Sequence, residues 1–387
     1  MKFSNPDIAV HKPIPAPLDT EYPVTAWGVD QCGESFKQLT IYRPQVGLHD
    51  VKFELKFCGI CHSDVHNVLN EMSEKWGSTY PIVPGHELVG TVVEVGEKVS
   101  RVKVGDNVGV GCIRDSCLIC EVCHRGEECY CVNGFTHTYN TPKKKENCHI
   151  GGNPEVQNWG GYSEFDVVHE HFIIKIPEGM PLEKAGPILC AGITMWSPLN
   201  HWGATNTEKK LNIGIVGIGG LGTMGIKLAA ALGHRVVAIS SSDKKIDVAK
   251  SKGAEDYVVS KDADSVRKER GKLDLIINTV SAPHDIAPYI SMLKTDGTLV
   301  QLGCIAAPMQ YNQFMLILKR ISIAGSLIGG IPATQEVVDF CFKNEIYPDI
   351  ELVEAGQLNK IYTELQDNNS AAVRYVLDIK KSLETTK

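Results

Sequence analysis

The sequence has no run of about eighteen apolar residues, the shortest segment that crosses a bilayer as a helix. Its first residues, MKFSNPDIAVHKP, lack the apolar core of a signal peptide. Low-complexity tracts are also missing, and the longest run of like charge is the three lysines at 143–145. We therefore expect a globular protein that resides in the cytoplasm.

The chain has no excess of positive charge, because 46 Asp and Glu residues outnumber 39 Lys and Arg residues and give a formal net charge of −7. Nucleic-acid phosphates repel an acidic chain, so nucleic-acid binding is disfavoured. The length of 387 residues exceeds the usual limit for one hydrophobic core and predicts two domains.

Cysteine is abundant, and its distribution is uneven. Thirteen cysteines would indicate disulfide bonds in a small secreted protein, but this chain is long. Seven of them lie between Cys112 and Cys148. Because thiols stay reduced in the cytoplasm, this clustering favours metal binding.

The pattern of apolar residues divides the chain into two parts. Between residues 51 and 110, runs such as VKFELKF and VGTVVEV alternate with Gly, Pro and Asp, which predicts a turn-rich, partly closed β domain. From about residue 193, apolar strands alternate with amphipathic helices, as in a doubly wound α/β domain with a parallel sheet. The six predicted strands lie at residues 211–217, 234–240, 256–260, 273–280, 297–303 and 322–328.

A helix at 333–344 and a strand at 374–379 follow. We assign them to the β-rich domain, because about fifty residues rarely form a core alone; a third small unit is the alternative. The predicted domains are 1–191 with 331–387, and 192–330.

The segment GIVGIGGLGTMG carries the pattern of a dinucleotide-binding turn. Gly217 permits the tight turn, Gly219 lets the backbone approach a pyrophosphate, and Gly222 permits close packing of the helix on the strand. The helix predicted at TMGIKLAAALG would direct its N-terminus at the anion, and Gly220 and Leu221 in the turn before it are also predicted to bind the cofactor. A glycine-rich turn that binds nothing is the alternative, which the flanking strand and helix disfavour.

The end of the second predicted strand lacks the Asp or Glu that holds the adenosine ribose in NAD enzymes. Its sequence is ISSSDKK, in which Ser240 and Ser241 are neutral donors and Lys245 is positive. These residues suit a 2′-phosphate, so we predict NADP(H) as the cofactor. Ribose binding by Asp243 and a plain polar turn are the alternatives.

Cys117, Cys120, Cys123 and Cys131 have the spacing C-x2-C-x2-C-x7-C. Four thiolates in one loop form a closed tetrahedral zinc site with no position for substrate, which predicts a structural role. Cys129 could compete with Cys131 for the fourth position. A zinc finger that grips a partner is less favoured, because the loop has mixed charge and no basic stripe.

Other potential ligands are scattered: Cys61, the adjacent His86 and Glu87, and Cys190. Two thiolates and a histidine leave a fourth position for an exchangeable ligand, as a catalytic Lewis acid requires. Spacing alone does not join residues so far apart. A small buried hydrophobe at Cys190 and a hydrogen-bonded core residue at His86 are the alternatives.

The order of these motifs resembles that of the zinc-dependent medium-chain alcohol dehydrogenases, and among them the cinnamyl alcohol dehydrogenase group. The resemblance runs from about residue 51 to 378 and rests on CGICHSD, PGHELVGTVVEVG, the four-cysteine loop, LCAGIT, GIGGLG and ISSSDKK. It implies a catalytic domain folded like a GroES barrel, a Rossmann domain, and a homodimer built through the Rossmann sheets. It also implies active-site zinc in the cleft between the domains.

The resemblance places the catalytic zinc ligands at Cys61, His86 and Cys190, with Glu87 able to enter or leave the coordination sphere. It also selects Cys131 as the fourth ligand of the structural zinc.

The resemblance further implies a proton relay in which Ser63 contacts the zinc-bound alkoxide and His66 passes the proton outward. Asp64 matches the acid that hydrogen-bonds the metal-bound histidine, and Thr194 lies where the family contacts the nicotinamide. The implied reaction is hydride transfer between the nicotinamide and a carbonyl group, interconverting aldehydes and primary alcohols. Without the surrounding motif, Ser63 would be a helix N-cap and His66 a surface histidine.

The sequence departs from the plant enzymes after the four-cysteine loop, where CVNGFTHTYN is one residue longer and residues 141–160 look extended. A pocket lined by Trp76, Phe135, His137 and Trp196 would favour aromatic or allylic aldehydes. Three other functions stay open: a zinc-free, quinone-reductase-like reductase of activated double bonds, an iminium reductase, and a non-catalytic NADP-binding sensor.

Overall fold

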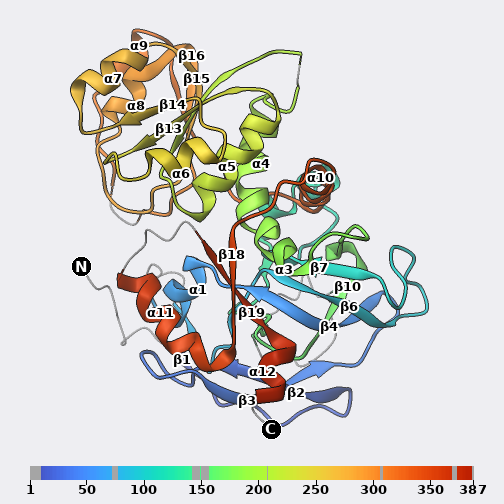
Figure 1. Ribbon diagram of the computed structural model, residues 1–387. Coiled ribbons are helices and arrows are strands. Elements are labelled where there is room, and N and C mark those ends of the chain that lie inside the picture. Colours follow the sequence, from blue (N-terminus) through green and yellow to red (C-terminus); the bar gives the residue numbers. More distant parts are fainter. Residues whose placement is uncertain are drawn as a thin grey trace. The chain divides into compact units, whose positions relative to one another are not determined.

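The computed structural model describes residues 10–71, 77–141, 149, 157–206, 208–305, 308–367 and 373–385 (Figure 1). The chain forms two compact units. Unit 1 comprises Met1–Cys190, Gly329–Phe342 and Asp349–Lys387, and unit 2 comprises Ala191–Ile328 and Lys343–Pro348. None of the helices in the described ranges is both long and apolar enough to span a membrane.

Unit 2 is built on a six-stranded parallel sheet with the order β14–β13–β12–β15–β16–β17. The strands are β12 (Asn212–Val216), β13 (Arg235–Ser240), β14 (Asp256–Val259), β15 (Leu273–Asn278), β16 (Leu293–Gln301) and β17 (Ser322–Gly325). Numbered along the chain, this order is 3-2-1-4-5-6, the order of the Rossmann fold. The predicted doubly wound sheet is confirmed.

Helices cover both faces of this sheet (Figure 1). One face carries α4 (Ala191–His201), α5 (Gly220–Ala231) and α6 (Ile246–Ser251), and the other carries α7 (Ala263–Glu269) and α8 (Ala287–Met292). The short α9 (Phe314–Ile317) precedes β17. Strand residues such as Ile213 and Ile215 are fully buried, because a parallel sheet covered on both faces has no solvent side.

Unit 1 contains a seven-stranded mixed sheet in which β4 (Asp50–Gly59) pairs with β6, β10 and β19. Its other strands are β6 (Leu88–Val95), β7 (Asn107–Val110), β10 (Phe165–His169), β11 (Ile174–Lys175), β18 (Ile350–Val353) and β19 (Arg374–Asp378). Two-stranded pairs form between β1 (Val10–His11) and β5 (Thr79–Tyr80), β2 (Glu21–Gly28) and β3 (Lys37–Pro44), and β8 (Ile113–Asp115) and β9 (Thr136–His137). The prediction of a β-rich part is confirmed.

The C-terminal segment adds strands and helices to unit 1. β19 pairs antiparallel with β4, with Val376 opposite Gly59, so residues near 374 lie beside the end of β4. The helices that accompany the sheet are α1 (His62–Val68), α2 (Glu121–His124), α3 (Leu182–Ala185), α10 (Ile331–Lys343), α11 (Leu358–Asp367) and α12 (Ile379–Thr385). Short 3₁₀ turns occur at Glu128–Tyr130, Glu170–Phe172, Gly186–Leu189 and Ala355–Gln357.

The side-chain alternation of β4 changes within the strand. Val51, Phe53 and Leu55 are buried, but the next buried side chain is that of Cys58. The pairing of β4 with β6 shifts register between Leu55 and Phe57, and such a bulge moves the following side chains to the opposite face. The bulge therefore explains why Cys58, at an even-numbered position, is buried like Val51, Phe53 and Leu55 at odd-numbered positions.

Candidate active site and metal centres

Four potential metal ligands from three distant segments meet in unit 1. The side-chain donor atoms of Cys61, His86, Glu87 and Cys190 all lie within 4.8 Å of one another, and all four residues are buried. The Sγ atoms of Cys61 and Cys190 are 3.9 Å apart. Two thiols and an imidazole beside a carboxylate are the donor set of a catalytic zinc site with one exchangeable position.

Strand pairing positions these segments. Cys61 is the N-cap residue of α1, shortly after β4, while His86 and Glu87 directly precede β6. Because β4 and β6 are antiparallel neighbours, the end of one and the start of the other lie at the same edge of the sheet. Cys190 follows a 3₁₀ turn that begins at Gly186, where a Cβ atom would come within 2.7 Å of the Glu87 carbonyl oxygen.

The buried carboxylate of Asp64 orients His86. Its Oδ1 lies 3.0 Å from Nδ1 of His86 and accepts from the Gly85 N–H at 3.2 Å, and its Oδ2 accepts from the Cys61 N–H at 2.9 Å. Asp64 is 0% exposed. With Nδ1 donating to this carboxylate, the lone pair on Nε2 of His86 is available to a metal.

Glu87 faces the guanidinium group of Arg374, with Oε1 and Nη2 3.0 Å apart. Burial raises the pKa of Glu87 to about 7, although the charge of Arg374 acts in the opposite direction. A Cβ atom on Gly59 would lie 1.8 Å from Oε2 of Glu87, so glycine is required beside the carboxylate. Arg374 arrives on the C-terminal strand β19, and no sequence motif had singled it out.

A third thiol, that of Cys112, adjoins the group. A hydrogen bond with Cys190 lowers the pKa of Cys61 well below its ordinary value, against the effect of burial. The same kind of bond lowers the pKa of Cys112, while the pKa of Cys190 is raised. The sequence analysis did not assign Cys112 to this group, because no spacing along the chain links it to Cys61 or Cys190.

The predicted relay residues lie on α1, beside Cys61. The Cys61 Sγ lies 3.6 Å from the Oγ of Ser63, which is exposed. Nδ1 of His66 is 2.8 Å from Oε2 of Glu71, which leaves Nε2 of His66 available for proton exchange. The ring of His62 stands edge-on to that of His66 at 4.6 Å. Glu71 and His62 are neighbours that the sequence analysis did not identify.

The four-cysteine loop forms a second potential metal centre. The Sγ atoms of Cys117, Cys120, Cys123 and Cys131 lie within 4.8 Å of one another. Individual separations are 3.4 Å from Cys131 to Cys117 and 4.0 Å from Cys117 to Cys123. Cys129 is outside this group and buried, and that burial raises its pKa to about 12. The loop thus brings four thiols together, and the fourth of them is Cys131 and not Cys129.

The glycine-rich turn joins β12 to α5 in unit 2. Gly217 has a φ of 89°, in the left-handed region that favours glycine. A Cβ atom on Gly222 would lie 1.7 Å from the carbonyl oxygen of Gly217, so the helix packs on the turn too closely for a side chain. Gly219 is the N-cap of α5, and Gly220 and Leu221 begin the helix. A Cβ atom on Gly219 or Gly220 would meet nothing, and this open helix N-terminus fits a pyrophosphate.

The end of β13 lies beside this turn. The Gly217 N–H donates at 2.9 Å to the carbonyl of the residue before Ser240, which ends β13. Lys245 donates from Nζ to the carbonyl of Ile218 at 2.7 Å. Ser241 follows Ser240 and is exposed. The structure therefore brings a lysine and two serines to the dinucleotide turn.

The predicted nicotinamide contact and the predicted pocket residues are divided between the units. Thr194 and Trp196 lie on α4 and are buried. In unit 1 the rings of Phe135 and His137 are 4.3 Å apart, and Phe135 packs against the four-cysteine group. Trp76 and most of the extension at 141–160 lie outside the described residues.

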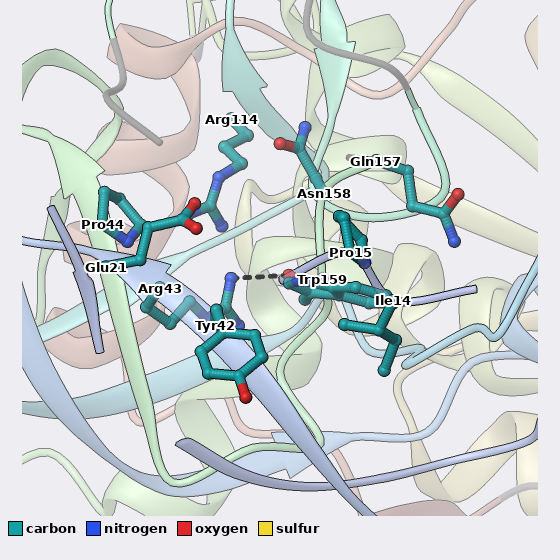
Figure 2. A pocket seen from close by; sticks show the side chains of 10 residues that line it. All are labelled: Ile14, Pro15, Glu21, Tyr42, Arg43, Pro44, Arg114, Gln157, Asn158 and Trp159. Carbon is teal, nitrogen blue, oxygen red and sulfur yellow. Dashed lines mark hydrogen bonds between the residues drawn. The ribbon is translucent and has the colours of Figure 1, made fainter. Parts of the chain in front are cut away.

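A separate cavity in unit 1 adjoins a buried ion network (Figure 2). Arg43 is 2% exposed and donates from Nη1 to the carbonyl of Trp159 at 2.9 Å. The carboxylate of Asp166 lies 2.9 Å from Arg43 and 2.7 Å from Arg114. The residues around this cavity belong to neither metal centre, and the network ties β3 and β8 to β10.

Two family models match the chain. The model for the alcohol dehydrogenase GroES-like domain matches residues 47–178, in unit 1. The model for the zinc-binding dehydrogenase matches residues 220–343, which cover most of unit 2.

Similar proteins match along nearly the whole chain. NADP-dependent alcohol dehydrogenase C of Mycobacterium bovis is 45% identical over 357 residues, which cover 92% of this chain and 98% of that protein. Aldehyde reductase YahK of Escherichia coli is 44% identical over 357 residues, again 92% of this chain and 98% of that protein. A solved cinnamyl alcohol dehydrogenase from Sorghum bicolor has a TM-score of 0.85 and 35% identity, and the match covers 93% of this chain and 99% of that one. The expected combination of GroES-like and Rossmann folds is thereby confirmed, and the chain belongs to the zinc-binding medium-chain alcohol dehydrogenases, within their cinnamyl alcohol dehydrogenase-like group.

Proposed function

We propose that this protein is a zinc-dependent alcohol dehydrogenase and aldehyde reductase that uses NADP(H) to interconvert aldehydes and primary alcohols. The observation that carries the proposal is the buried group of Cys61, His86, Glu87 and Cys190, with all donor atoms within 4.8 Å. Relatives named as an NADP-dependent alcohol dehydrogenase and an aldehyde reductase support it. In this scheme residues 1–191 and 331–387 form the catalytic domain, and residues 192–330 bind the cofactor.

Cys61, His86 and Cys190 would hold the catalytic zinc. Zinc bound there supplies a Lewis acid that polarises the carbonyl oxygen of the substrate. Glu87 would enter or leave the coordination sphere, and Arg374 would neutralise its carboxylate when it is out of that sphere. The 3.0 Å contact of Glu87 with Arg374 supports this exchange, as does a Glu87 pKa of about 7 that results mainly from burial.

Ser63 and His66 would move the proton. They lie three residues apart on α1 and therefore on one face of the helix, with Ser63 next to Cys61. The Ser63 hydroxyl would give its proton to the alkoxide formed from the aldehyde, and Ser63 would be reprotonated from solvent through His66. Glu71 holds Nδ1 of His66, which leaves Nε2 to exchange the proton. Thr194 would contact the nicotinamide.

The cofactor would lie on the glycine-rich turn with its pyrophosphate at the N-terminus of α5. Ser240, Ser241 and Lys245 would bind the 2′-phosphate of NADP(H). The bond from Lys245 to Ile218 supports this assignment, because it holds a positive side chain at the turn. The four-cysteine group, closed on itself, would hold a structural zinc.

The substrates that fit this proposal best are aromatic or allylic aldehydes. Adjacent rings at Phe135 and His137 support an aromatic lining for the substrate pocket. The relative from Sorghum bicolor, named as a cinnamyl alcohol dehydrogenase, is consistent with this class.

We also propose a homodimer that forms through unit 2 and resides in the cytoplasm. β17 is an edge strand of the parallel sheet, and an unpaired edge is a ready template for a second copy. Just before β17 in the chain, α9 exposes Phe314 and Ile317 to 58% and 69%, and neighbouring exposed apolar side chains are typical of an interaction surface. Two metal centres that depend on reduced thiols suit a reducing compartment.

Initial rates of NADPH and NADH oxidation over a panel of aliphatic, allylic and aromatic aldehydes test the function, together with zinc analysis of the purified protein. We expect two zinc ions per chain and NADPH-dependent reduction that is fastest with conjugated aldehydes. One zinc per chain would favour the quinone-reductase-like alternative. Tight NADPH binding without turnover of aldehydes or iminium compounds would favour the sensor.

A further inference from the structure

A buried tyrosine packs on the histidine of the candidate catalytic zinc site. The ring of Tyr139 is nearly parallel to the imidazole of His86, with centroids 6.1 Å apart and 18° between the planes. Tyr139 is 6% exposed. It lies shortly after β9 (Thr136–His137), outside the segments that contribute potential ligands.

The residues on either side of Tyr139 are anchored. The preceding Thr138 donates its N–H to the Cys112 carbonyl at 3.2 Å. The following Asn140 accepts from the Thr79 N–H at 2.9 Å and donates to Asn67 at 3.1 Å. These bonds fix the segment that carries the Tyr139 ring.

The hydroxyl of Tyr139 is buried, and among the described residues it has no hydrogen bond of standard geometry. The carboxylate of Asp64 bonds the same His86 ring at 3.0 Å, which makes it the candidate acceptor for this hydroxyl. Burial raises the pKa of Tyr139, and the charge of Asp64 also raises it. Asp64 accepts from Cys61, Gly85 and His86, and a carboxylate offers about four acceptor positions, so one is left for the phenol.

We propose that Tyr139 is a positioning residue for the catalytic zinc. Its ring restricts rotation of the His86 imidazole, and its hydroxyl donates to Asp64, the carboxylate that fixes the His86 tautomer. Both contacts keep Nε2 of His86 directed at the thiols of Cys61 and Cys190 before the metal binds. This inference rests on the proposed function in assuming zinc at that group.

Zinc affinity separates this role from simple core packing. The protein with two bound zinc ions is equilibrated in a series of zinc–chelator buffers, and the zinc that remains bound per chain is measured. For each centre, the midpoint is the concentration of free zinc at which half of that centre is occupied. The test variant is Tyr139→Phe, which keeps the ring and removes the hydroxyl. The matched control is Tyr362→Phe, because Tyr362 is also a buried phenol but bonds the hydroxyl of Tyr162 at 3.1 Å.

We expect Tyr139→Phe to raise the midpoint of the Cys61 centre by about 10-fold to 100-fold, the usual effect of losing a residue that supports a metal ligand. The midpoint of the four-cysteine centre should stay within about twofold of its original value, and Tyr362→Phe should leave both unchanged. An unchanged Cys61 midpoint in Tyr139→Phe, or an equal shift in Tyr362→Phe, would overturn the inference and leave the proposed function intact. A wild-type protein that retains only the four-cysteine zinc would overturn both.

Discussion

His169 is predicted to make this protein acid-sensitive, and replacing it with asparagine should reduce that sensitivity. His169 ends β10 and caps the following 3₁₀ turn by accepting the His171 N–H on Nδ1 at 3.1 Å. Its ring lies 5.6 Å from that of His49 and 5.7 Å from that of His149. Asparagine keeps an acceptor for the His171 N–H but cannot be protonated, so His169→Asn isolates the charge.

The size and sign of the effect follow from the pKa of His169. Burial first, and then the charges of His149, His49 and His171, lower it from 6.5 to about 4. The unfolded chain therefore takes up the proton before the folded chain does as the pH falls. The contribution of His169 to stability is complete above pH 6.5 and is lost as the pH falls toward 4. Linkage gives a loss of about 2 kcal/mol between pH 7.5 and 5, an upper value because the ring is only partly buried.

Thermal unfolding of wild type and variant at pH 7.5, 6.5, 5.5 and 5 measures this loss. At pH 7.5 the two Tm values should agree within about 3 °C, and by pH 5 the wild type should have lost about 2–6 °C more than His169→Asn, since the loss of about 2 kcal/mol is an upper value. Loss of zinc at low pH lowers the Tm of both proteins equally, so it does not affect the difference between their Tm values. His201→Asn, at an exposed position on α4, serves as the control and should follow the wild type. Parallel curves for wild type and His169→Asn would refute the reasoning.

Other substitutions separate the remaining roles. Cys61→Ser should lower kcat/KM for aldehyde reduction by more than about 100-fold with little change in Tm, since it weakens the open zinc centre. Cys120→Ser should lower Tm by roughly 10 °C, because it breaks the closed centre; equal losses of activity and Tm in both variants would contradict this division. Ser240→Asp should shift the kcat/KM ratio from NADPH toward NADH by about 100-fold, since repulsion of the 2′-phosphate and a new bond to the ribose each contribute roughly 1.4 kcal/mol. An unchanged ratio would remove Ser240 from the 2′-phosphate site.

The doubly wound unit could be predicted because its signals are local. Each buried parallel strand is a continuous apolar run, and the run predicted at 273–280 matches β15 (Leu273–Asn278). The four-cysteine centre is local in the same way, since all its ligands lie within the fifteen-residue segment from Cys117 to Cys131. In both cases the residues that act together in the structure are also close together in the sequence.

Contacts made by the C-terminal strand could not be predicted in this way. Arg374 donates to the Ile60 carbonyl at 3.4 Å across 314 positions of sequence, through the pairing of β19 with β4. The chain around Arg374 carries no pattern that names its partner. Tyr139 is similar, because its role depends on a hydrogen-bonded loop and on an imidazole supplied by another segment.

The Cys61 centre lies between these extremes. A constant alternation along β4 would not bury Cys58, and the bulge between Leu55 and Phe57 supplies the change of face. The carboxylate of Glu87 then fits only because position 59 is glycine, where any Cβ would lie 1.8 Å from Oε2. The need for space beside the Glu87 carboxylate is visible in the sequence only as a glycine two residues before the candidate ligand Cys61. This glycine can be interpreted only once the pairing of β4 with β6 is known. The ligands could therefore be predicted from the family resemblance, but not from their spacing in the sequence.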